Sequence, residues 1–367
     1  MGTSSRWRVA VLGFDHMHAG DQLRLAAANP RAELVGAWDD RPGRAEAVLA
    51  DLDLPGSMLY ADAATMIDRA APDIVVVCST TADHVRWTEF LARRGVHVVV
   101  EKPFASSLAD ADRMIAAIRD TGRTLTVNWP LAWYPPHRTT RRLIAEGAIG
   151  PVVAIHYFDG NRGPLKHVHD KQEVATSDDP ATKNASWWYR PEAGGGSLLD
   201  YLGYGVTLGT WFRDGELPSE VTAVTHVPAG LRVDEQSVVT AAYAGGLSTF
   251  QTRWGTLTDP WTVQSAPKCG FTVVGASGVI TSWDYAEQVT LYTAARPGGA
   301  AIPVDVLPPA ERDHLAYLID RLDRDAPVEG PSSWRISRAG QQIVDAAVAS
   351  AQRRTTVPLA ELAGSRR

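Results

Sequence analysis

The chain has 367 residues, 45% of them hydrophobic and 21% charged, and this length exceeds what one ordinary core fills, so two domains are expected. With 36 basic and 42 acidic residues the net charge is −6, and no basic block stands out, which argues against nucleic acid or a membrane surface as a partner. No apolar run reaches the ~20 residues of a membrane span. Because the start has no secretory pattern and there are only two cysteines, Cys78 and Cys269, we expect a cytoplasmic protein without a disulfide framework.

The first third of the chain alternates short apolar runs with amphipathic stretches of helix length. Strands are expected at residues 7–12, 33–38, 73–78, 96–100 and 124–128, and helices at 21–28, 43–52, 84–94 and 108–121. This alternation predicts βαβ units and a parallel sheet covered on both faces. The fold class is therefore α/β, beginning with a doubly wound, Rossmann-type domain over residues 1–126.

The pattern changes after about residue 125. A further helix is expected at 134–146, and later helices at 198–212, 311–324 and 337–353. Between residues 152 and 292, period-2 alternation predicts antiparallel strands with one solvated face, most clearly at 221–227, 238–243 and 247–254. We therefore expect an α+β domain over 127–330 with a large, mostly antiparallel, open sheet. A long polar loop at 160–186 interrupts it, and loops of this length are usually functional or disordered.

The first strand runs into a loop that only partly resembles a dinucleotide-binding turn. In G-x-G-x-x-G the second glycine lets the backbone approach the pyrophosphate and the third allows close helix packing. Here Gly13 takes the first position, while Asp15 and His18 take the other two. A helix N-terminus would still offer N–H groups to a phosphate, and His16 could add a donor; the alternative is simple helix capping. The candidate loop residues are Gly13, Phe14, Asp15, His16 and Met17.

Asp39 follows the second strand, 26 residues after Gly13. A carboxylate at this strand end is typical of a side chain that holds the ribose 2′-hydroxyl of NAD. Arg41 could instead meet a 2′-phosphate, so NADP stays open beside NAD. A solvated turn before Pro42 is the alternative reading of Asp39.

Several further motifs occur in a characteristic order. They are Arg44-Ala45 after the second strand, the stretch from Cys78 through Ser79 and Thr80 to His84, Glu101-Lys102-Pro103 after the fourth strand, Gly147 and Gly150 after a helix, and Gly194-Gly195-Gly196-Ser197-Leu198-Leu199-Asp200. In this order and spacing the chain resembles the Gfo/Idh/MocA family of sugar and cyclitol oxidoreductases over essentially its whole length. Of the family's T-P-N-x-x-H stretch, only the histidine is kept.

The resemblance implies that the first domain binds NAD(P) and that the second covers the nicotinamide with its sheet. A C-terminal segment, 331–367, would return to pack on the first domain. Cofactor contacts are implied for Arg44, Ser79, Thr80, His84, Glu101 and Lys102, and Asn128 ends a strand that faces the cofactor. The open sheet face often pairs subunits in this family, which implies a homodimer or homotetramer.

The same resemblance marks Lys102, Asp200 and Tyr204 as the catalytic set. Many members have histidine at the last position, and tyrosine is similar to the branch of glucose–fructose oxidoreductase and dihydrodiol dehydrogenase. Asp200 and Tyr204 are four residues apart and share one face of a helix. Because a free tyrosine has a pKa near ~10, we expect the Lys102 ammonium to lower the pKa of Tyr204 so that it can exchange a proton.

Other polar and aromatic residues are candidates for contacts with the substrate. Arg162, Lys166 and His169 would line the entrance, and aromatic residues would stack on a sugar face: Trp129, Trp133, Trp187, Trp188 and Tyr189. Aromatic side chains are more often core than platform. His167, His169 and Asp170, with His156 and Asp159 upstream, could suggest a metal. A zinc site needs three or four converging ligands, and the sequence does not establish that these converge, so no metal is predicted.

These observations predict an NAD(P)-dependent oxidoreductase acting on a ring alcohol or ketone of a sugar, glycoside or cyclitol. Two alternatives stay open. One is redox-assisted glycoside cleavage, in which transient oxidation activates elimination. The other is a non-catalytic nucleotide- or sugar-binding regulator, which the departures at Asp15 and His18 motivate.

Overall fold

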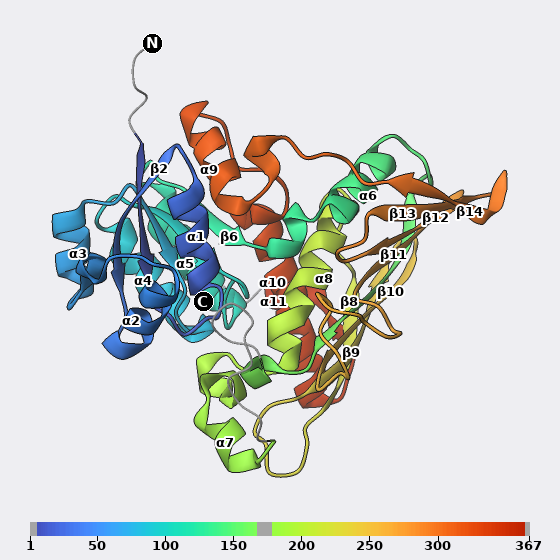
Figure 1. Ribbon diagram of the computed structural model, residues 1–367. Coiled ribbons are helices and arrows are strands. Elements are labelled where there is room, and N and C mark those ends of the chain that lie inside the picture. The colour runs from blue at the N-terminus through green and yellow to red at the C-terminus, as the bar shows by residue number, and fades with distance from the viewer. Residues whose placement is uncertain (1–5, 167–177, 364–367) are drawn as a thin grey trace.

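The computed structural model describes residues 6–166 and 178–363, and places two β-sheets with their helices side by side (Figure 1). The first sheet has six strands in the order β3-β2-β1-β4-β5-β6. Its strands are β1 (Trp7–Leu12), β2 (Ala32–Trp38), β3 (Leu59–Tyr60), β4 (Ile74–Val77), β5 (His97–Glu101) and β6 (Leu125–Asn128). All its pairings are parallel, so the predicted fold class is confirmed.

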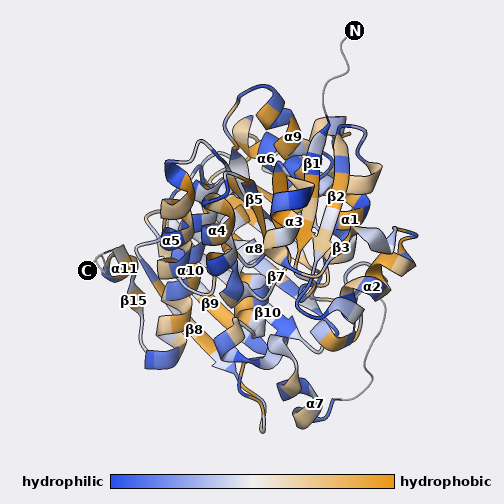
Figure 2. Cartoon of the chain, turned by 90° about the vertical axis from the view of Figure 1, so that its left-hand side faces the viewer, coloured by the Kyte–Doolittle hydropathy of each residue, from blue (hydrophilic) through white to orange (hydrophobic). Residues whose placement is uncertain are grey.

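This sheet is rich in apolar residues because both of its faces are covered by helices. They are α1 (Ala19–Ala28), α2 (Pro42–Asp51), α3 (Ala63–Ala70), α4 (His84–Ala92) and α5 (Leu108–Arg119). All four residues of β4 are apolar and buried, as both faces of the strand are covered. Figure 2 shows hydrophobic colouring concentrated in β1 and β5, whereas the outer helices carry both kinds of residue.

Two elements of this half were not predicted, β3 and α3. β3 has only two residues and is too short for a periodic signal. The start of α3 does carry a readable sign, because the Asp62 carboxylate caps the helix by accepting the Thr65 N–H at 2.7 Å. The elements that were predicted for this half are present, with ends that differ by at most two residues.

The second sheet has nine strands in the order β14-β13-β12-β11-β7-β10-β9-β8-β15. They are β7 (Val152–Asn161), β8 (Glu220–His226), β9 (Gln236–Tyr243), β10 (Gly246–Trp254), β11 (Gly270–Gly275), β12 (Gly278–Trp283), β13 (Gln288–Thr293), β14 (Arg296–Pro303) and β15 (Val357–Pro358). Only the β7–β10 pairing is parallel among those described. The predicted large, mostly antiparallel sheet is confirmed.

Helices cover one face of this sheet and connect it to the first. α8 (Ser197–Phe212) lies against β7 and β10, and α10 (Trp334–Arg353) lies against α8, β8 and α5. The remaining helices are α6 (Pro135–Ala145), α7 (Pro180–Ala185), α9 (His314–Asp323) and α11 (Leu359–Ala363). α10 contacts the first half of the chain through an Arg338–Asp112 ion pair and the Leu108 N–H, which donates to Asp345 at 2.7 Å.

Three further expectations from the sequence can be compared with this structure. β6 belongs to the first sheet and ends at Asn128, so the expected domain boundary after residue 126 falls inside a strand. The expected loop at 160–186 contains α7, and its residues 167–177 lie outside the described part of the chain. Among the described residues, no helix has the length and apolar character needed to cross a bilayer.

Candidate active site

A buried ion pair joins the two halves of the molecule. Lys102 follows the end of β5, and Asp200 lies in the first turn of α8. The Lys102 ammonium contacts the Asp200 carboxylate directly, and each residue is only 4% exposed. The indole N–H of Trp254 on β10 donates to the other Asp200 oxygen at 3.0 Å. The two charges therefore balance each other inside the protein, as buried charges must.

Glu101, beside the lysine, holds α1 and β6 against β5. Its buried carboxylate accepts hydrogen bonds from Gln22 Nε2 at 2.9 Å and Asn128 Nδ2 at 2.7 Å, and lies 3.0 Å from His18 Nδ1. Burial opposes ionisation of Glu101, but His18 and these donors outweigh it and leave its pKa below the ordinary value. Glu101 and Asn128, both predicted cofactor contacts, thus bond to each other and fix the strand end from which Lys102 projects.

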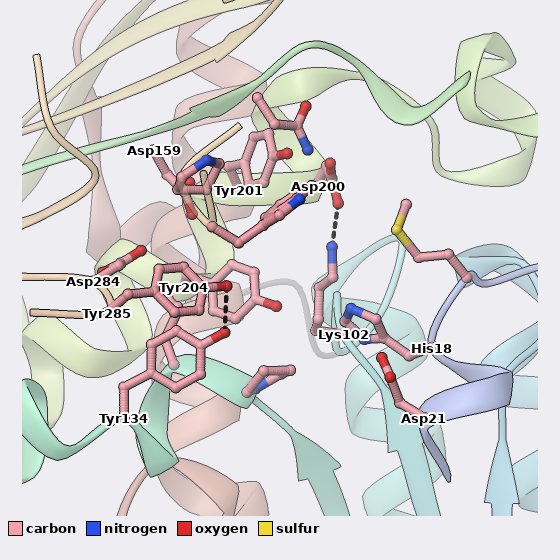
Figure 3. A pocket seen from close by; sticks show the side chains of 16 residues that line it. His18, Asp21, Lys102, Tyr134, Asp159, Asp200, Tyr201, Tyr204, Asp284 and Tyr285 are labelled. Carbon is pink, nitrogen blue, oxygen red and sulfur yellow. Dashed lines mark hydrogen bonds and ion pairs between the residues drawn. The ribbon is translucent and has the colours of Figure 1, made fainter. Parts of the chain in front are cut away.

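Tyr204 is held on α8 by close packing on both sides. A Cβ at Gly203 would come within 2.7 Å of the Trp129 ring, and one at Gly205 within 2.4 Å of the Tyr157 ring. Glycine at these two positions lets the helix sit between two aromatic rings. Lys102 Nζ lies 5.3 Å from the centre of the Tyr204 ring, and Figure 3 shows Tyr204, Asp200 and Lys102 around one pocket.

Two predicted sugar platforms, Trp129 and Tyr189, are buried in the core. Trp129 is 1% exposed, donates its indole N–H to Ser337 Oγ at 3.0 Å and meets the Tyr204 ring edge-on. Tyr189 is 2% exposed, and its hydroxyl donates to Glu235 at 3.1 Å. Neither ring has a face free for a ligand, because both serve as core.

The predicted lowering of the Tyr204 pKa is also wrong, because the net shift has the opposite sign. Burial, followed by the neighbouring Tyr134 and Glu101, raises the pKa of Tyr204 well above its ordinary value. The charge of Lys102 is already paired with Asp200 and does not offset this burial. Tyr204 therefore keeps its proton across the neutral range.

The pocket lies between the carboxyl ends of the first sheet and the covered face of the second (Figure 3). Lys102, His18 and Asp21 line one side of it, and Asp200, Tyr201 and Tyr204 of α8 line another. The remaining wall consists mainly of residues that the sequence analysis did not assign to the site: Tyr134, Asp159, Asn161, Trp261, Asp284 and Tyr285. Asp159 did carry a signal, since it continues the inward-facing alternation of Ile155 and Tyr157 along β7.

Two carboxylates lie close together in that wall. Atoms of Asp159, Asp284 and Cys269 that could bind a metal all lie within 4.8 Å of one another. Asp159 accepts a hydrogen bond from the Tyr157 hydroxyl at 2.7 Å, and Asp284 lies 2.8 Å from His137 Nε2. Burial and the neighbouring Asp284 raise the pKa of Asp159 to about 7.

Two other groups have similarly close polar atoms, namely His16 with His18 and Glu101, and Asp15 with Asp39 and Asp40. In the first, His18 already bonds to Glu101, and in the second the Arg44 guanidinium contacts all three carboxylates. The expectation of no metal stays a prediction.

The predicted nucleotide loop packs tightly on the end of β4. Gly13 has φ +83°, and a Cβ there would lie 2.9 Å from the Ser79 backbone nitrogen, so the position requires glycine. The Phe14 N–H donates to Asp39 at 3.2 Å, and Arg44 donates to both Asp39, at 2.7 Å, and Asp15, at 2.7 Å. Arg44 therefore balances the negative charge of Asp15, which would otherwise repel a phosphate.

A neighbouring segment covers this loop. The Trp187 indole donates to the Asp15 carbonyl at 3.0 Å, and the rings of Trp187 and Trp188 stack at 3.9 Å. Arg41 pairs with Asp15 at 2.8 Å, an interaction that competes with a contact to a 2′-phosphate. The cavity beside the loop is lined by Phe14, His16, Met17, Arg44 and Trp188, among others.

The hydrogen bonds of His16 indicate whether the loop from Gly13 to Met17 fits a dinucleotide. Its Nδ1 accepts the His18 backbone N–H at 3.2 Å, so a neutral ring carries its proton on Nε2. Burial, and then His18 and Lys102, lower the pKa of His16 well below the ordinary value and keep the ring neutral. Nε2 is buried and has no partner among the described residues. A buried N–H donor next to the start of α1 fits a phosphate oxygen.

We expect His16→Asn to weaken NADH binding about 10- to 100-fold, the cost of one hydrogen bond to a charged group. The asparagine amide oxygen replaces Nδ1 as acceptor for the His18 N–H, while the Nε2 donor is lost. Energy transfer from tryptophan to NADH measures the dissociation constant. His97→Asn, at a buried histidine outside this cavity, is the control, and an unchanged affinity of His16→Asn would refute the role.

The other predicted site residues have local partners. Ser79 and Thr80 follow β4, where the Ser79 hydroxyl donates to the Thr80 carbonyl and the Thr80 hydroxyl to Asp83. His84 begins α4, with Nδ1 3.2 Å from the Phe104 carbonyl and a buried Nε2 without a partner among the described residues. Arg162 donates to Asp259 at 2.8 Å, and Lys166 lies 3.7 Å from Asp178. Neither lines the pocket around Tyr204, and His169 lies outside the described residues.

Comparison with known proteins agrees with this architecture. Residues 7–129 match the model of the oxidoreductase family with an NAD-binding Rossmann fold, and residues 137–281 match the GFO/IDH/MocA C-terminal domain. The 1,5-anhydro-D-fructose reductase of Ensifer adhaerens is 31% identical over 313 residues, 83% of this chain and 82% of that protein. The chain belongs to the Gfo/Idh/MocA family. The resemblance inferred from its motifs is confirmed, and it is an oxidoreductase with an NAD-binding domain.

Other Gfo/Idh/MocA relatives match more locally. A D-apiose dehydrogenase of Paraburkholderia graminis is 34% identical over 153 residues, so the chain spans about two fifths of that protein, 39%, with 40% of its own length. Among solved structures, an inositol dehydrogenase homologue from Azotobacter vinelandii in complex with NAD+ has a TM-score of 0.78 at 18% identity, over 97% of this chain and 98% of that one. An Agrobacterium radiobacter oxidoreductase has a TM-score of 0.76 at 19% identity, over 98% and 100%. At these identities the likeness concerns the fold.

Proposed function

We propose that the chain transfers a hydride between NAD and a ring carbon of a sugar or cyclitol that carries a secondary hydroxyl or ketone. The observation that carries this proposal is the arrangement of Lys102, Asp200 and Tyr204 around one pocket at the carboxyl ends of the parallel strands, where doubly wound folds bind their ligands. The names of the relatives that act on apiose, anhydrofructose and inositol support the substrate class.

Tyr204 is our candidate for the proton carrier. Bound NAD supplies the donor or acceptor of the hydride. A carbonyl oxygen that gains a hydride at its carbon must also gain a proton, and the buried Tyr204 phenol holds one across the neutral range. In the direction of oxidation the same hydroxyl has to be deprotonated, which its raised pKa opposes. The arrangement therefore favours ketone reduction at neutral pH.

Lys102 and Asp200 act on the same oxygen by position and charge. The Lys102 ammonium stabilises negative charge that develops on the substrate oxygen, and Asp200 holds the ammonium in place while Trp254 holds Asp200. The loop from Gly13 to Met17, with Asp39 and His16, would hold the dinucleotide.

Two further proposals concern the chain's surroundings. We infer a homodimer or homotetramer formed through the outer face of the second sheet. Val224 and Val238 are paired neighbours there, on β8 and β9, and are 69% and 42% exposed. Sedimentation of the Val224→Lys variant tests this assembly.

A cytoplasmic location is supported by the free cysteines, which are both buried. Cell fractionation tests this location.

The experiment that tests the activity has two stages. Titration with NADH and NADPH, followed by energy transfer from tryptophan, is expected to show saturable binding with a preference for NADH; nucleotide released on denaturation would reveal a cofactor already bound. Sugars and cyclitols are then offered with NAD+, and their ketones with NADH. Cofactor binding without turnover of any compound would overturn the oxidoreductase proposal, whereas release of an aglycone without net NADH would indicate glycoside cleavage.

A further inference from the structure

The charges around the pocket are unevenly balanced. Asp21 pairs with Arg24 at 2.6 Å, and Asp200 pairs with Lys102. Two acidic side chains of the lining are left, Asp159 and Asp284. No lysine or arginine within the described ranges forms an ion pair with either of them.

The positive charge close to Asp159 and Asp284 is too small to balance both carboxylates. Their side chains are almost fully buried, and they lie in one cluster with Cys269. The Tyr157 hydroxyl donates to Asp159 but carries no charge, and the His137 ring, bonded to Asp284, could balance at most one of the two acids. Burial, and then repulsion by Asp284, raise the pKa of Asp159 to about 7, so this carboxyl holds a proton near neutral pH at a place where another cation could bind.

The rest of the wall is aromatic. The hydroxyls of Tyr134 and Tyr285 lie 2.8 Å apart, and their ring centres 4.9 Å apart. Tyr201, Tyr204 and Trp261 also line the pocket. Aromatic faces attract cations through their quadrupole, most strongly where water is excluded. Carboxylates beside aromatic rings are the chemistry that recognises an ammonium group.

We propose that the substrate is an amino sugar or aminocyclitol whose ammonium group lies between Asp159 and Asp284 while its reacting carbon faces Tyr204 and Lys102. The inference rests on the proposed function, whose substrate class it narrows. A neutral sugar could donate hydroxyl hydrogen bonds to both acids but would leave their repulsion in place. A sugar acid would add a third negative charge and is disfavoured.

Matched sugar pairs test this inference. Glucose is compared with its 2-, 3- and 6-amino-deoxy analogues and with the N-acetyl form of each, using NAD+ with the sugars and NADH with the corresponding ketones. At least one amino compound is expected to exceed both its hydroxyl parent and its N-acetyl form at least tenfold in kcat/KM. Equal or better use of the neutral compounds in all pairs would overturn the inference while leaving the proposed oxidoreductase intact.

Two variants test whether Asp159 and Asp284 cause the preference for an amino group. Asp159→Asn and Asp284→Asn remove one charge each at nearly constant volume, and each is expected to lower the ratio of amino to hydroxyl kcat/KM at least tenfold. Thermal unfolding confirms that each variant is folded. An unchanged ratio in both folded variants would place the ammonium elsewhere and overturn the assignment.

The same assays distinguish two further outcomes, the absence of turnover and the binding of a metal ion. If no compound is turned over, the proposed function fails, and calorimetric binding of the same pairs still decides the amino preference. A divalent ion is the other possible occupant of the acidic pair. Activity that is lost in EDTA, restored by Mn2+ or Zn2+ and indifferent to the amino group would assign the pair to a metal and overturn the proposal.

Discussion

Tyr204→Phe is expected to lower kcat about 10²- to 10⁴-fold, the usual contribution of a positioned acid or base. The change removes the hydroxyl and leaves the ring that packs edge-on against Trp129 at 5.3 Å, so α8 keeps its position between its two aromatic neighbours. Turnover is measured by NADH absorbance and cofactor affinity by energy transfer from tryptophan. The dissociation constant for NADH is expected to stay within about threefold, since the lost group is assigned to the substrate oxygen.

Tyr243→Phe is the matched control, because Tyr243 is also buried but lies on β9 and does not line the pocket. Retained kcat in Tyr204→Phe, or an equal loss in both variants, would remove Tyr204 as the proton carrier. The pH dependence gives a second criterion. With the pKa of Tyr204 raised, oxidation is expected to quicken as pH rises from about 7 to about 10, whereas ketone reduction stays level over that range.

Lys102→Met is expected to destabilise the protein by about 3–5 kcal/mol, because it leaves the Asp200 carboxylate buried without its counter-ion. Activity is expected to be lost as well, since the ammonium that we assign to the substrate oxygen is gone. Adding Asp200→Asn to Lys102→Met removes the unpaired charge and is expected to restore part of the stability without restoring turnover. Denaturant unfolding at pH 7 and the NADH assay, run on both variants, separate the two roles.

Arg113→Met is the matched control for loss of a cation, because its pair with Glu89 is on the surface and its side chain is 55% exposed. Such a pair contributes about 0–1 kcal/mol. If Lys102→Met proved as stable as Arg113→Met, the Lys102–Asp200 pair would not be the buried junction between the two halves that the structure shows. A double variant that regained turnover would show that Lys102 acts only through stability.

The site divides into a part that is readable along the chain and a part that is not. Glu101-Lys102-Pro103 follows a β-branched run, and Asp200 and Tyr204 are separated by one helical turn. Such signals are local, and through the family resemblance that they carry they predicted three residues, Lys102, Asp200 and Tyr204, that lie around one pocket. Trp129 shows where local pattern fails: a tryptophan after a strand can be core or ligand platform, and only the close approach of α8 makes it core.

By itself the sequence determined the parallel and antiparallel sheets, because hydrophobic periodicity records neighbours along the chain. The resemblance carried by its short motifs then predicted a nucleotide site at the first sheet and the Lys102–Asp200–Tyr204 set. Only the tertiary structure decided how those groups are charged. It paired Lys102 with Asp200 and buried Tyr204, and this burial raises the pKa of the phenol. It also brought Asp159 and Asp284, 125 residues apart in number, into one wall. Electrostatic energies depend on distance and burial in space, which no spacing along the chain expresses.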